Sequence, residues 1–198
     1  MADLSIARGP DGPPLLDLTI GGLLHRAAAA VPDRLALVAG TADPALRRRW
    51  TYAELLRESE ACAHALLRRF EPGERVAVWA HNIPEWVLLE FGAALAGVVL
   101  VTVNPALRAG EVEYILTQSK AAGVFVVPAF RGNPLHDTAL ALQPRCPSLR
   151  HVIGFDGWAA FIAEGTAHTA PLPAVQPGDA AMIQYTSGTT GFPKGALL

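Results

Sequence analysis

Hydrophobic positions along the chain form two kinds of segment, short apolar runs and longer stretches with apolar residues at helical spacing. In the stretch 51–67, apolar residues recur at positions such as Leu55, Cys62 and Leu66, which indicates a helix with one buried face. The run Val98–Val103 is nearly continuous and mostly β-branched, which is typical of a strand covered on both faces. Because strand and helix segments alternate, we expect an α/β fold, a mostly parallel sheet with helices on both faces.

The apolar runs predict strands, and the segments between them predict helices. The strands are expected near residues 35–38, 75–80, 98–103, 123–127, 151–155 and 180–185. The helices are expected near residues 20–31, 51–67, 84–96, 110–119, 134–142 and 157–163. We expect the four strands between residues 75 and 155 to lie side by side in one parallel sheet.

Two of these helices carry start signals. Thr51 and Glu54 have the spacing of a capping box, in which each side chain accepts a hydrogen bond from the other residue's backbone N–H. Asn82 stands two residues before Pro84, a proline suited to the first helical turn. It is a candidate cap of the helix expected at 84–96.

The chain of 198 residues is expected to be one incomplete domain. Residues 1–18 form a leader with several glycines and prolines, and residues 19–170 form the α/β subdomain. Residues 171–198 supply a Pro-rich linker, a strand and a loop that belong to the next subdomain. Since residues 195–198 resemble the start of another strand, we expect a fragment of a longer protein.

Composition narrows the function classes. A net charge of −2 and a pI near 6.3 argue against a nucleic-acid partner, and the basic run 47–49 is expected to be a solvated loop. The apolar stretch Phe91–Val103 has 13 residues, too few for an integral membrane segment, which needs about 20.

The cysteines and histidines indicate no disulfide and no metal site. Cys62 and Cys146 are far apart in the sequence, which favours buried free thiols and a cytoplasmic location. The histidines have no metal-ligand spacing, so we expect no metal site, and nothing indicates an oligomeric state.

A loop rich in hydroxyl groups follows the predicted strand 180–185. Residues 186–191 hold four hydroxyl residues and two glycines, and a lysine follows at 194, one of two lysines among 16 cations. Glycines let backbone N–H groups converge on an anion, hydroxyls add donors, and the lysine adds a compact charge. The sequence therefore predicts a phosphate site made of Thr186, Ser187, Gly188, Thr189, Thr190, Gly191 and Lys194.

Two other interpretations of this loop are weaker. A flexible Ser/Thr/Gly linker is disfavoured because apolar strand segments flank the loop on both sides. A Walker A loop would need glycine before the lysine and Ser or Thr after it, but Pro193 and Gly195 stand there. These two residues also disfavour a helix at the lysine, so the loop is expected to join two strands.

Three segments resemble one known family. Residues 185–196, YTSGTTGFPKGA, resemble the signature of the acyl-adenylate-forming (AMP-binding) superfamily, which includes acyl-CoA synthetases, luciferases and peptide-synthetase adenylation domains. Residues 50–55, WTYAEL, and 94–105, ALAGVVLVTVNP, resemble two further motifs of that family in the expected order. The resemblance is to the large N-terminal domain of an acyl-CoA synthetase or fatty-acid–CoA ligase.

The resemblance implies a two-step reaction with ATP, Mg²⁺ and coenzyme A. A carboxylic acid, expected to be a fatty acid, attacks the α-phosphate of ATP to give an acyl-adenylate and pyrophosphate, and the thiol of coenzyme A then takes the acyl group. By this resemblance, Thr186, Ser187, Thr189 and Thr190 donate to phosphate oxygens. Gly188 and Gly191 permit the loop shape, and Lys194 offsets the charge of the leaving pyrophosphate.

The chain lacks other parts that such an enzyme needs. The family's adenine-binding segment, magnesium-binding glutamate, ribose-binding aspartate and C-terminal lid with its catalytic lysine are not found in the sequence. We therefore expect no catalytic residue within residues 1–198 and no adenylation by this chain alone. The alternatives are an aryl-CoA ligase, a peptide-synthetase adenylation domain, or a non-catalytic remnant that binds a nucleotide or another anion.

Overall fold

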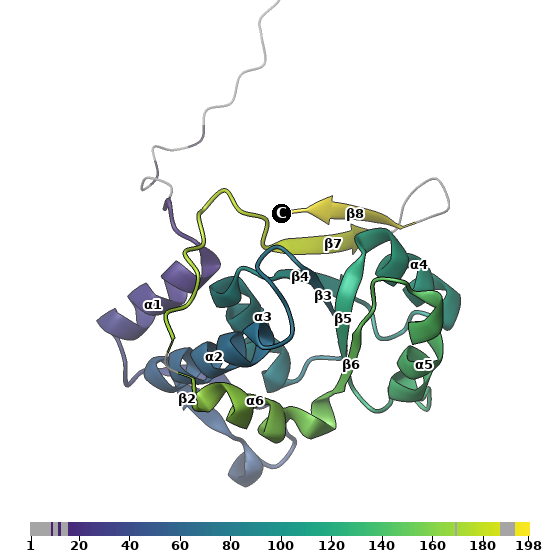
Figure 1. Ribbon diagram of the computed structural model, residues 1–198. Coiled ribbons are helices and arrows are strands. Elements are labelled where there is room, and N and C mark those ends of the chain that lie inside the picture. The colour runs from purple at the N-terminus through teal and green to yellow at the C-terminus, as the bar shows by residue number, and fades with distance from the viewer. Residues whose placement is uncertain (1–8, 10–11, 13–15, 169, 187–192) are drawn as a thin grey trace, which may run out of the picture.

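Six strands form the central sheet in the order β6-β5-β3-β4-β7-β8 (Figure 1). The structure is a computed structural model that describes residues 9, 12, 16–168, 170–186 and 193–198. All neighbouring strands of this sheet are parallel except β7 and β8. The strands are β1 (Leu35–Val38), β2 (Arg49–Thr51), β3 (Arg75–Trp79), β4 (Val99–Val103), β5 (Ala121–Val126), β6 (His151–Gly154), β7 (Met182–Thr186) and β8 (Lys194–Leu197).

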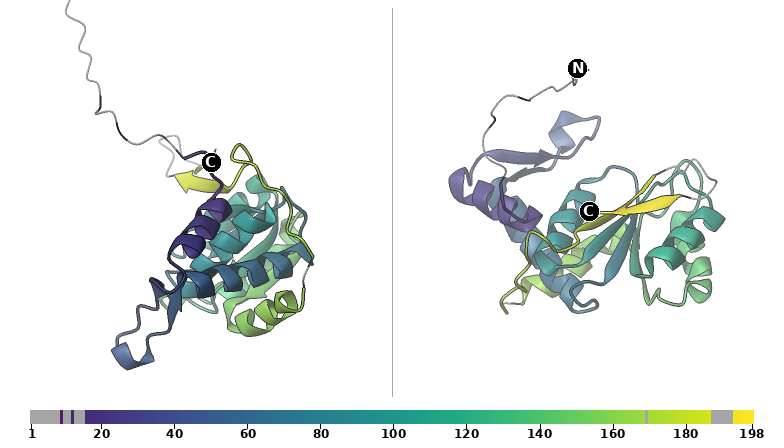
Figure 2. Two further views of the ribbon diagram at one scale, coloured as in Figure 1. Left: turned by 90° about the vertical axis from the view of Figure 1, so that its left-hand side faces the viewer. Right: turned by 90° about the horizontal axis from the view of Figure 1, so that it is seen from above.

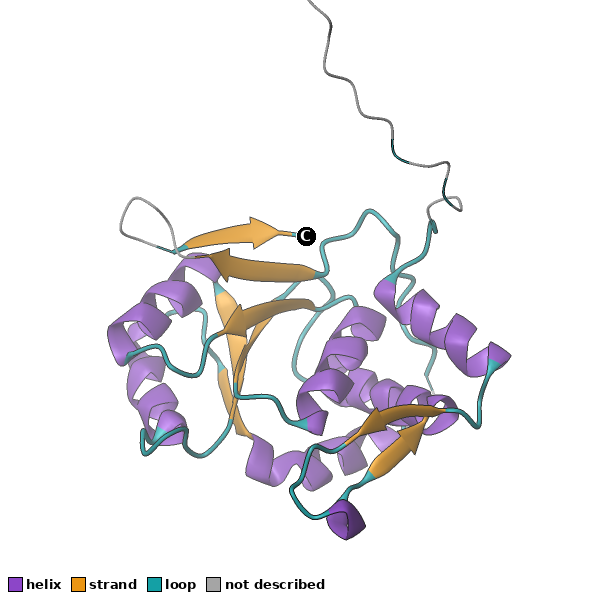
Figure 3. Ribbon diagram, turned by 180° about the vertical axis from the view of Figure 1, so that it is seen from behind, coloured by secondary structure: helices purple, strands orange, loops and turns teal. Residues whose placement is uncertain are grey.

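Helices cover both faces of this sheet, so the predicted α/β fold is confirmed. The chain crosses from β3 to β4 in one direction and from β4 back to β5 in the other. Right-handed crossovers therefore place α3 and α6 on one face and α4 and α5 on the opposite face, and α1 and α2 pack against α3 on the first face (Figures 1 and 3). The helices are α1 (Ile20–Ala30), α2 (Tyr52–Leu67), α3 (Pro84–Ala96), α4 (Ala109–Ser119), α5 (Leu135–Leu142) and α6 (Trp158–Thr166).

The core lies along the middle strands. All six residues of β5 are buried, as are four of the five residues in each of β3 and β4. This confirms that the continuous apolar runs are strands covered on both faces. The four strands predicted between residues 75 and 155 are adjacent, as expected. β7 joins the same sheet beside β4, and the division of the chain at residue 170 stays a prediction.

Small residues let α2 contact two neighbouring helices closely. A Cβ placed on Gly165 of α6 would lie 1.8 Å from the backbone oxygen of Ala61 on α2. A Cβ on Gly92 of α3 would lie 2.6 Å from Sγ of Cys62. Both contacts allow no side chain larger than hydrogen, so these glycines set how closely the helices pack on this face.

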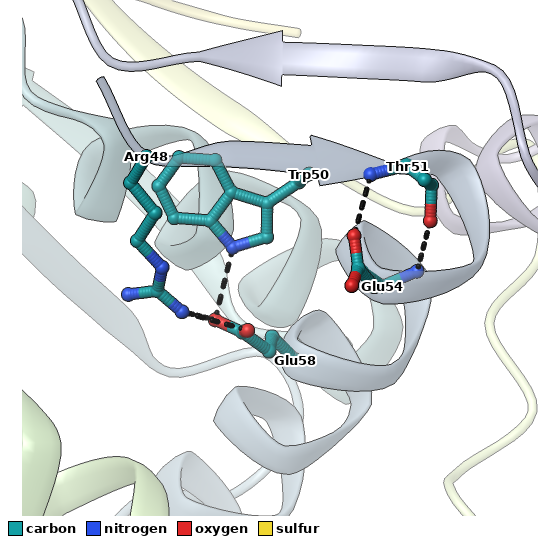
Figure 4. Close-up of polar contacts among 5 residues, drawn as sticks. All are labelled: Arg48, Trp50, Thr51, Glu54 and Glu58. Atoms are coloured by element: carbon teal, nitrogen blue, oxygen red, sulfur yellow. Dashed lines mark hydrogen bonds and ion pairs between the residues drawn. The ribbon is translucent and has the colours of Figure 1, made fainter. Parts of the chain in front are cut away.

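The β1–β2 hairpin stands apart from the central sheet, as Figure 2 shows. Trp50 of β2 is buried, and its indole N–H donates to Glu58 of α2 at 3.1 Å. Arg48 stacks on the same indole at 4.3 Å and pairs with Glu58 at 2.8 Å (Figure 4). The loop predicted for the basic run 47–49 is therefore wrong in part, since Arg49 begins β2 and this short strand was not expected.

Both helices begin where predicted, but only one of them has the predicted cap. The capping box of α2 forms as expected, with Glu54 N–H donating to Thr51 Oγ1 at 3.2 Å and Thr51 N–H donating to the Glu54 carboxylate at 2.8 Å (Figure 4). These bonds lower the pKa of Glu54. α3 begins at Pro84, as predicted, but its N-cap is Ile83 and not Asn82, and no side chain forms a capping hydrogen bond. Pro84 in the first turn removes one donor that would need a cap.

Both cysteines are free and buried, as expected. Burial raises the pKa of the Cys62 thiol far above its ordinary range, and it also raises that of Cys146. Within the residues described, no helix is both long enough and apolar enough to cross a membrane.

Gly165→Ala should destabilise the chain by about 3 kcal/mol, because the new methyl group overlaps the backbone of α2, which cannot move as a side chain can. Gly157→Ala is the matched control, since a Cβ there meets no atom within 4 Å. The test is urea unfolding followed by circular dichroism. Equal stability of the two variants would contradict the close helix contact.

Candidate functional site

The carboxyl ends of β3 and β4 form a switch point in the sheet. After β3 the chain continues into α3 on one face, and after β4 it continues into α4 on the other face. The two connections diverge, and in open α/β sheets this leaves a crevice at the strand ends where ligands bind. The candidate site is therefore expected at this edge, which also carries the carboxyl end of β7.

A cavity of about 480 Å³ lies at this switch point, and we call it the edge cavity. Its walls come from the segments that leave β3 and β4, from the first turns of α3 and α4, and from the ends of the β7–β8 hairpin. The lining mixes amides and a carboxylate with apolar side chains, a composition suited to an organic ligand with polar groups. The lining residues are Ala80, Asn82, Trp86, Thr102, Val103, Asn104, Leu107, Glu111, Ile115, Gln184, Tyr185, Thr186 and Pro193.

Asn104 shapes the rim of the edge cavity where the chain leaves β4. Its side-chain oxygen accepts a hydrogen bond from Ala106 N–H at 2.9 Å, and its backbone oxygen accepts one from the Trp79 indole at 3.1 Å. Trp79 is the last residue of β3, so the second bond joins the two strands at the switch point. The Glu111 side chain accepts from Arg108 N–H at 2.9 Å and fixes the start of α4.

The two ends of the predicted phosphate loop meet at the same edge. Thr186 ends β7, Lys194 begins β8, and the two residues are paired across this antiparallel hairpin. The loop therefore joins two strands, as expected. Both residues are exposed, and Lys194 makes no ion pair with a carboxylate in the described part of the chain. The other predicted site residues, Ser187, Gly188, Thr189, Thr190 and Gly191, lie outside the described residues.

Tyr185 was not identified as a site residue from the sequence, although it stands next to the loop. Its side chain is half-buried against α4, and its hydroxyl donates to Oε1 of Gln118. Burial raises the pKa of the Tyr185 hydroxyl, and the neighbouring Tyr114 raises it further. The strand pattern alone could not indicate this contact, because Gln118 is 67 positions away in the sequence.

The site has no metal-binding group in the part of the chain that the structure describes. There, no three His, Cys, Asp or Glu side chains gather in a way that could hold a metal ion. The site thus offers anion-binding groups at the loop ends and a mixed cavity beside them.

Comparison with known proteins identifies the family. The family model described as AMP-binding enzyme matches residues 24–198. The chain belongs to the AMP-binding enzyme family. It is 32% identical over 98% of its length to the acyl-CoA ligase SID4 of Ajellomyces capsulatus, and 33% identical over 98% to the mitochondrial medium-chain acyl-CoA ligase ACSF2 of Danio rerio. The chain spans 36% of the length of each of these relatives.

Two solved structures have a similar fold. The N-terminal domain of FACL13 from Mycobacterium tuberculosis is 29% identical, with a TM-score of 0.76 over 91% of this chain and 44% of that chain. MbtA from Mycobacterium smegmatis is 32% identical, with a TM-score of 0.76 over 92% of this chain and 34% of that chain. The chain is therefore the N-terminal part of an AMP-binding enzyme fold.

Asn104→Ala should lower the free energy of unfolding by about 1 kcal/mol, because Ala106 N–H loses its acceptor at the cavity rim. Asn82→Ala is the control, since Asn82 lines the same cavity and its side chain bonds no described residue. Urea titration of both variants checks this. A loss as large in Asn82→Ala would show that the Asn104 turn has no special role.

Proposed function

We propose that this chain is the phosphate-binding part of an ATP-dependent acyl-CoA synthetase that activates a carboxylic acid as its acyl-adenylate and transfers it to coenzyme A. The proposal rests on the position of the family's signature loop. The two ends of this loop, Thr186 and Lys194, are paired in the β7–β8 hairpin and stand at the switch point beside the edge cavity. Lys194 is exposed and pairs with no carboxylate among the described residues, which suits it to bind a phosphate oxygen.

In the proposed reaction, a carboxylate oxygen attacks the α-phosphorus of ATP and the bond to pyrophosphate breaks. The hydroxyl and N–H groups of the loop donate to the β- and γ-phosphate oxygens, and Lys194 offsets the charge that gathers on the leaving pyrophosphate. The thiol of coenzyme A then attacks the acyl carbon and AMP leaves. No three His, Cys, Asp or Glu side chains gather to hold a metal ion among the described residues, so we derive no step from Mg²⁺ and propose it only as a counter-ion of the triphosphate.

Two features of the relatives bear on the substrate and the location. A fatty or medium-chain acid is supported by relatives named medium-chain acyl-CoA ligases and by the solved structure of a Mycobacterium tuberculosis fatty acyl CoA synthetase. An aryl-CoA ligase or a peptide-synthetase adenylation domain stays the alternative. We infer a cytoplasmic location from the two free thiols, although the ACSF2 relatives are named as mitochondrial.

Lys194→Met should weaken binding of inorganic triphosphate to this chain roughly tenfold, because one charge-assisted hydrogen bond is lost. Lys120→Met is the matched control, since it removes the same charge from the residue just before β5. Lys120 lies at the amino ends of the parallel strands, whereas Lys194 lies at the carboxyl ends. Isothermal titration calorimetry at two salt concentrations measures both. Binding should also weaken with added salt. Equal losses in the two variants would contradict the phosphate role of Lys194.

The chain of 198 residues should release no pyrophosphate from ATP with any fatty acid, whereas a chain extended to the length of its relatives should. The reason is that the reaction needs the carboxylate held in line with the α-phosphate, and these residues supply only the pyrophosphate side. A coupled pyrophosphate assay with acids of increasing length tests both chains. Turnover by the short chain would show that the catalytic groups are misassigned.

A further inference from the structure

Tyr185 connects the loop end of the β7–β8 hairpin to α4, on the face of the sheet that carries α4 and α5. It is the residue before Thr186, and its hydroxyl donates to Oε1 of Gln118 on α4 and lies 3.5 Å from the backbone oxygen of Ile115. α4 packs on β4 and β5 in the middle of the sheet. The hydrogen bond therefore ties the start of the loop to the rigid part of the fold.

The ring of Tyr185 also covers β8. Tyr185 is paired with Gly195 across the two strands. A Cβ on Gly195 would lie 3.1 Å from Cζ of Tyr185 and 2.9 Å from Cγ2 of Ile183. Because Gly195 does not have a positive φ, the glycine is needed here for the space that its missing side chain leaves. The missing side chain lets the ring lie against the strand, in the manner of an aromatic residue that covers a cross-strand glycine.

β8 has little else to hold it in the described part of the chain. All four of its residues are exposed, and its strand neighbour in the sheet is β7 alone. The next pair beyond Tyr185 and Gly195 is Thr186 and Lys194, the two ends of the loop. Apart from its backbone pairing with β7, β8 is thus contacted next to the loop ends by the Tyr185 ring.

We propose that Tyr185, bonded to Gln118 and seated on Gly195, is a positioning residue that sets the orientation of Thr186 and Lys194 toward the phosphates. This inference rests on the proposed function of the loop. It assigns no contact between Tyr185 and the phosphates: the tyrosine acts through the strand ends it holds. The hydroxyl of Tyr185, and not only its ring, is required.

The test uses Tyr185→Phe and Gln118→Leu, each of which removes one partner of the same hydrogen bond. Both should increase amide hydrogen exchange at Thr186 and Lys194 about fivefold, the effect of one ordinary hydrogen bond. Triphosphate binding should weaken by about the same factor, and the double variant should behave like either single one. Gln118→Glu keeps an acceptor and should retain slow exchange. Tyr52→Phe, which removes a tyrosine hydroxyl far away at the start of α2, should change neither measurement.

Two results would overturn the positioning role. One is unchanged exchange at Thr186 and Lys194 in both variants, and the other is wild-type affinity for triphosphate in variants whose exchange is faster. A different result concerns the proposed function. If the wild-type chain binds no triphosphate, the phosphate role of the loop fails, and faster exchange in the variants would still show that Tyr185 holds the strand ends.

Discussion

The handedness of the crossovers from β3 to β4 and from β4 to β5 determines most of this structure. Each parallel connection turns to the right, and the two run in opposite directions across the sheet, so α3 and α4 must lie on opposite faces. The middle strands are then covered on both sides, which accounts for their buried, continuous apolar runs. The same divergence opens the edge cavity at the carboxyl ends of these strands.

Packing on the two faces differs because the helices differ in number and size. Four helices share one face, and α2 contacts α3 and α6 through positions where Gly92 and Gly165 leave no room for a side chain. Two helices cover the other face, and Tyr185 reaches the side of α4 there. One layer is thus held by close backbone contact, and the other carries the hydrogen bond next to the loop.

The carboxyl edge of the sheet carries both the signature loop of the AMP-binding enzyme family and the edge cavity. The signature loop begins at Thr186 and returns at Lys194, beside the cavity at the switch point. Anion-binding groups and a mixed cavity at one edge suit the proposed reaction, in which pyrophosphate leaves while an organic acid is held nearby. The fold thereby brings the loop and the cavity together from segments about 100 residues apart.

Interactions within one turn or one run could be predicted from the sequence, because they depend on neighbouring residues. The Thr51–Glu54 capping box, the burial of the run Val99–Val103 and the two strands around the loop are of this kind. Ile83 replaced Asn82 as a helix cap because the first turn contains a proline, whose missing N–H reduces the need for a side-chain cap.

Contacts between distant segments depended on the tertiary structure. Arg49 pairs in β2 because the neighbouring Trp50 is buried beside Glu58, and local spacing carries no sign of that. The same holds for the bond of Tyr185 to Gln118 and for the contact of Gly165 with Ala61. The sequence by itself determined most of the strands and helices and the position of the family's signature loop between two strands, since these follow from local pattern. Only the folded chain decided which distant side chains meet, because sheet order and helix faces bring them together.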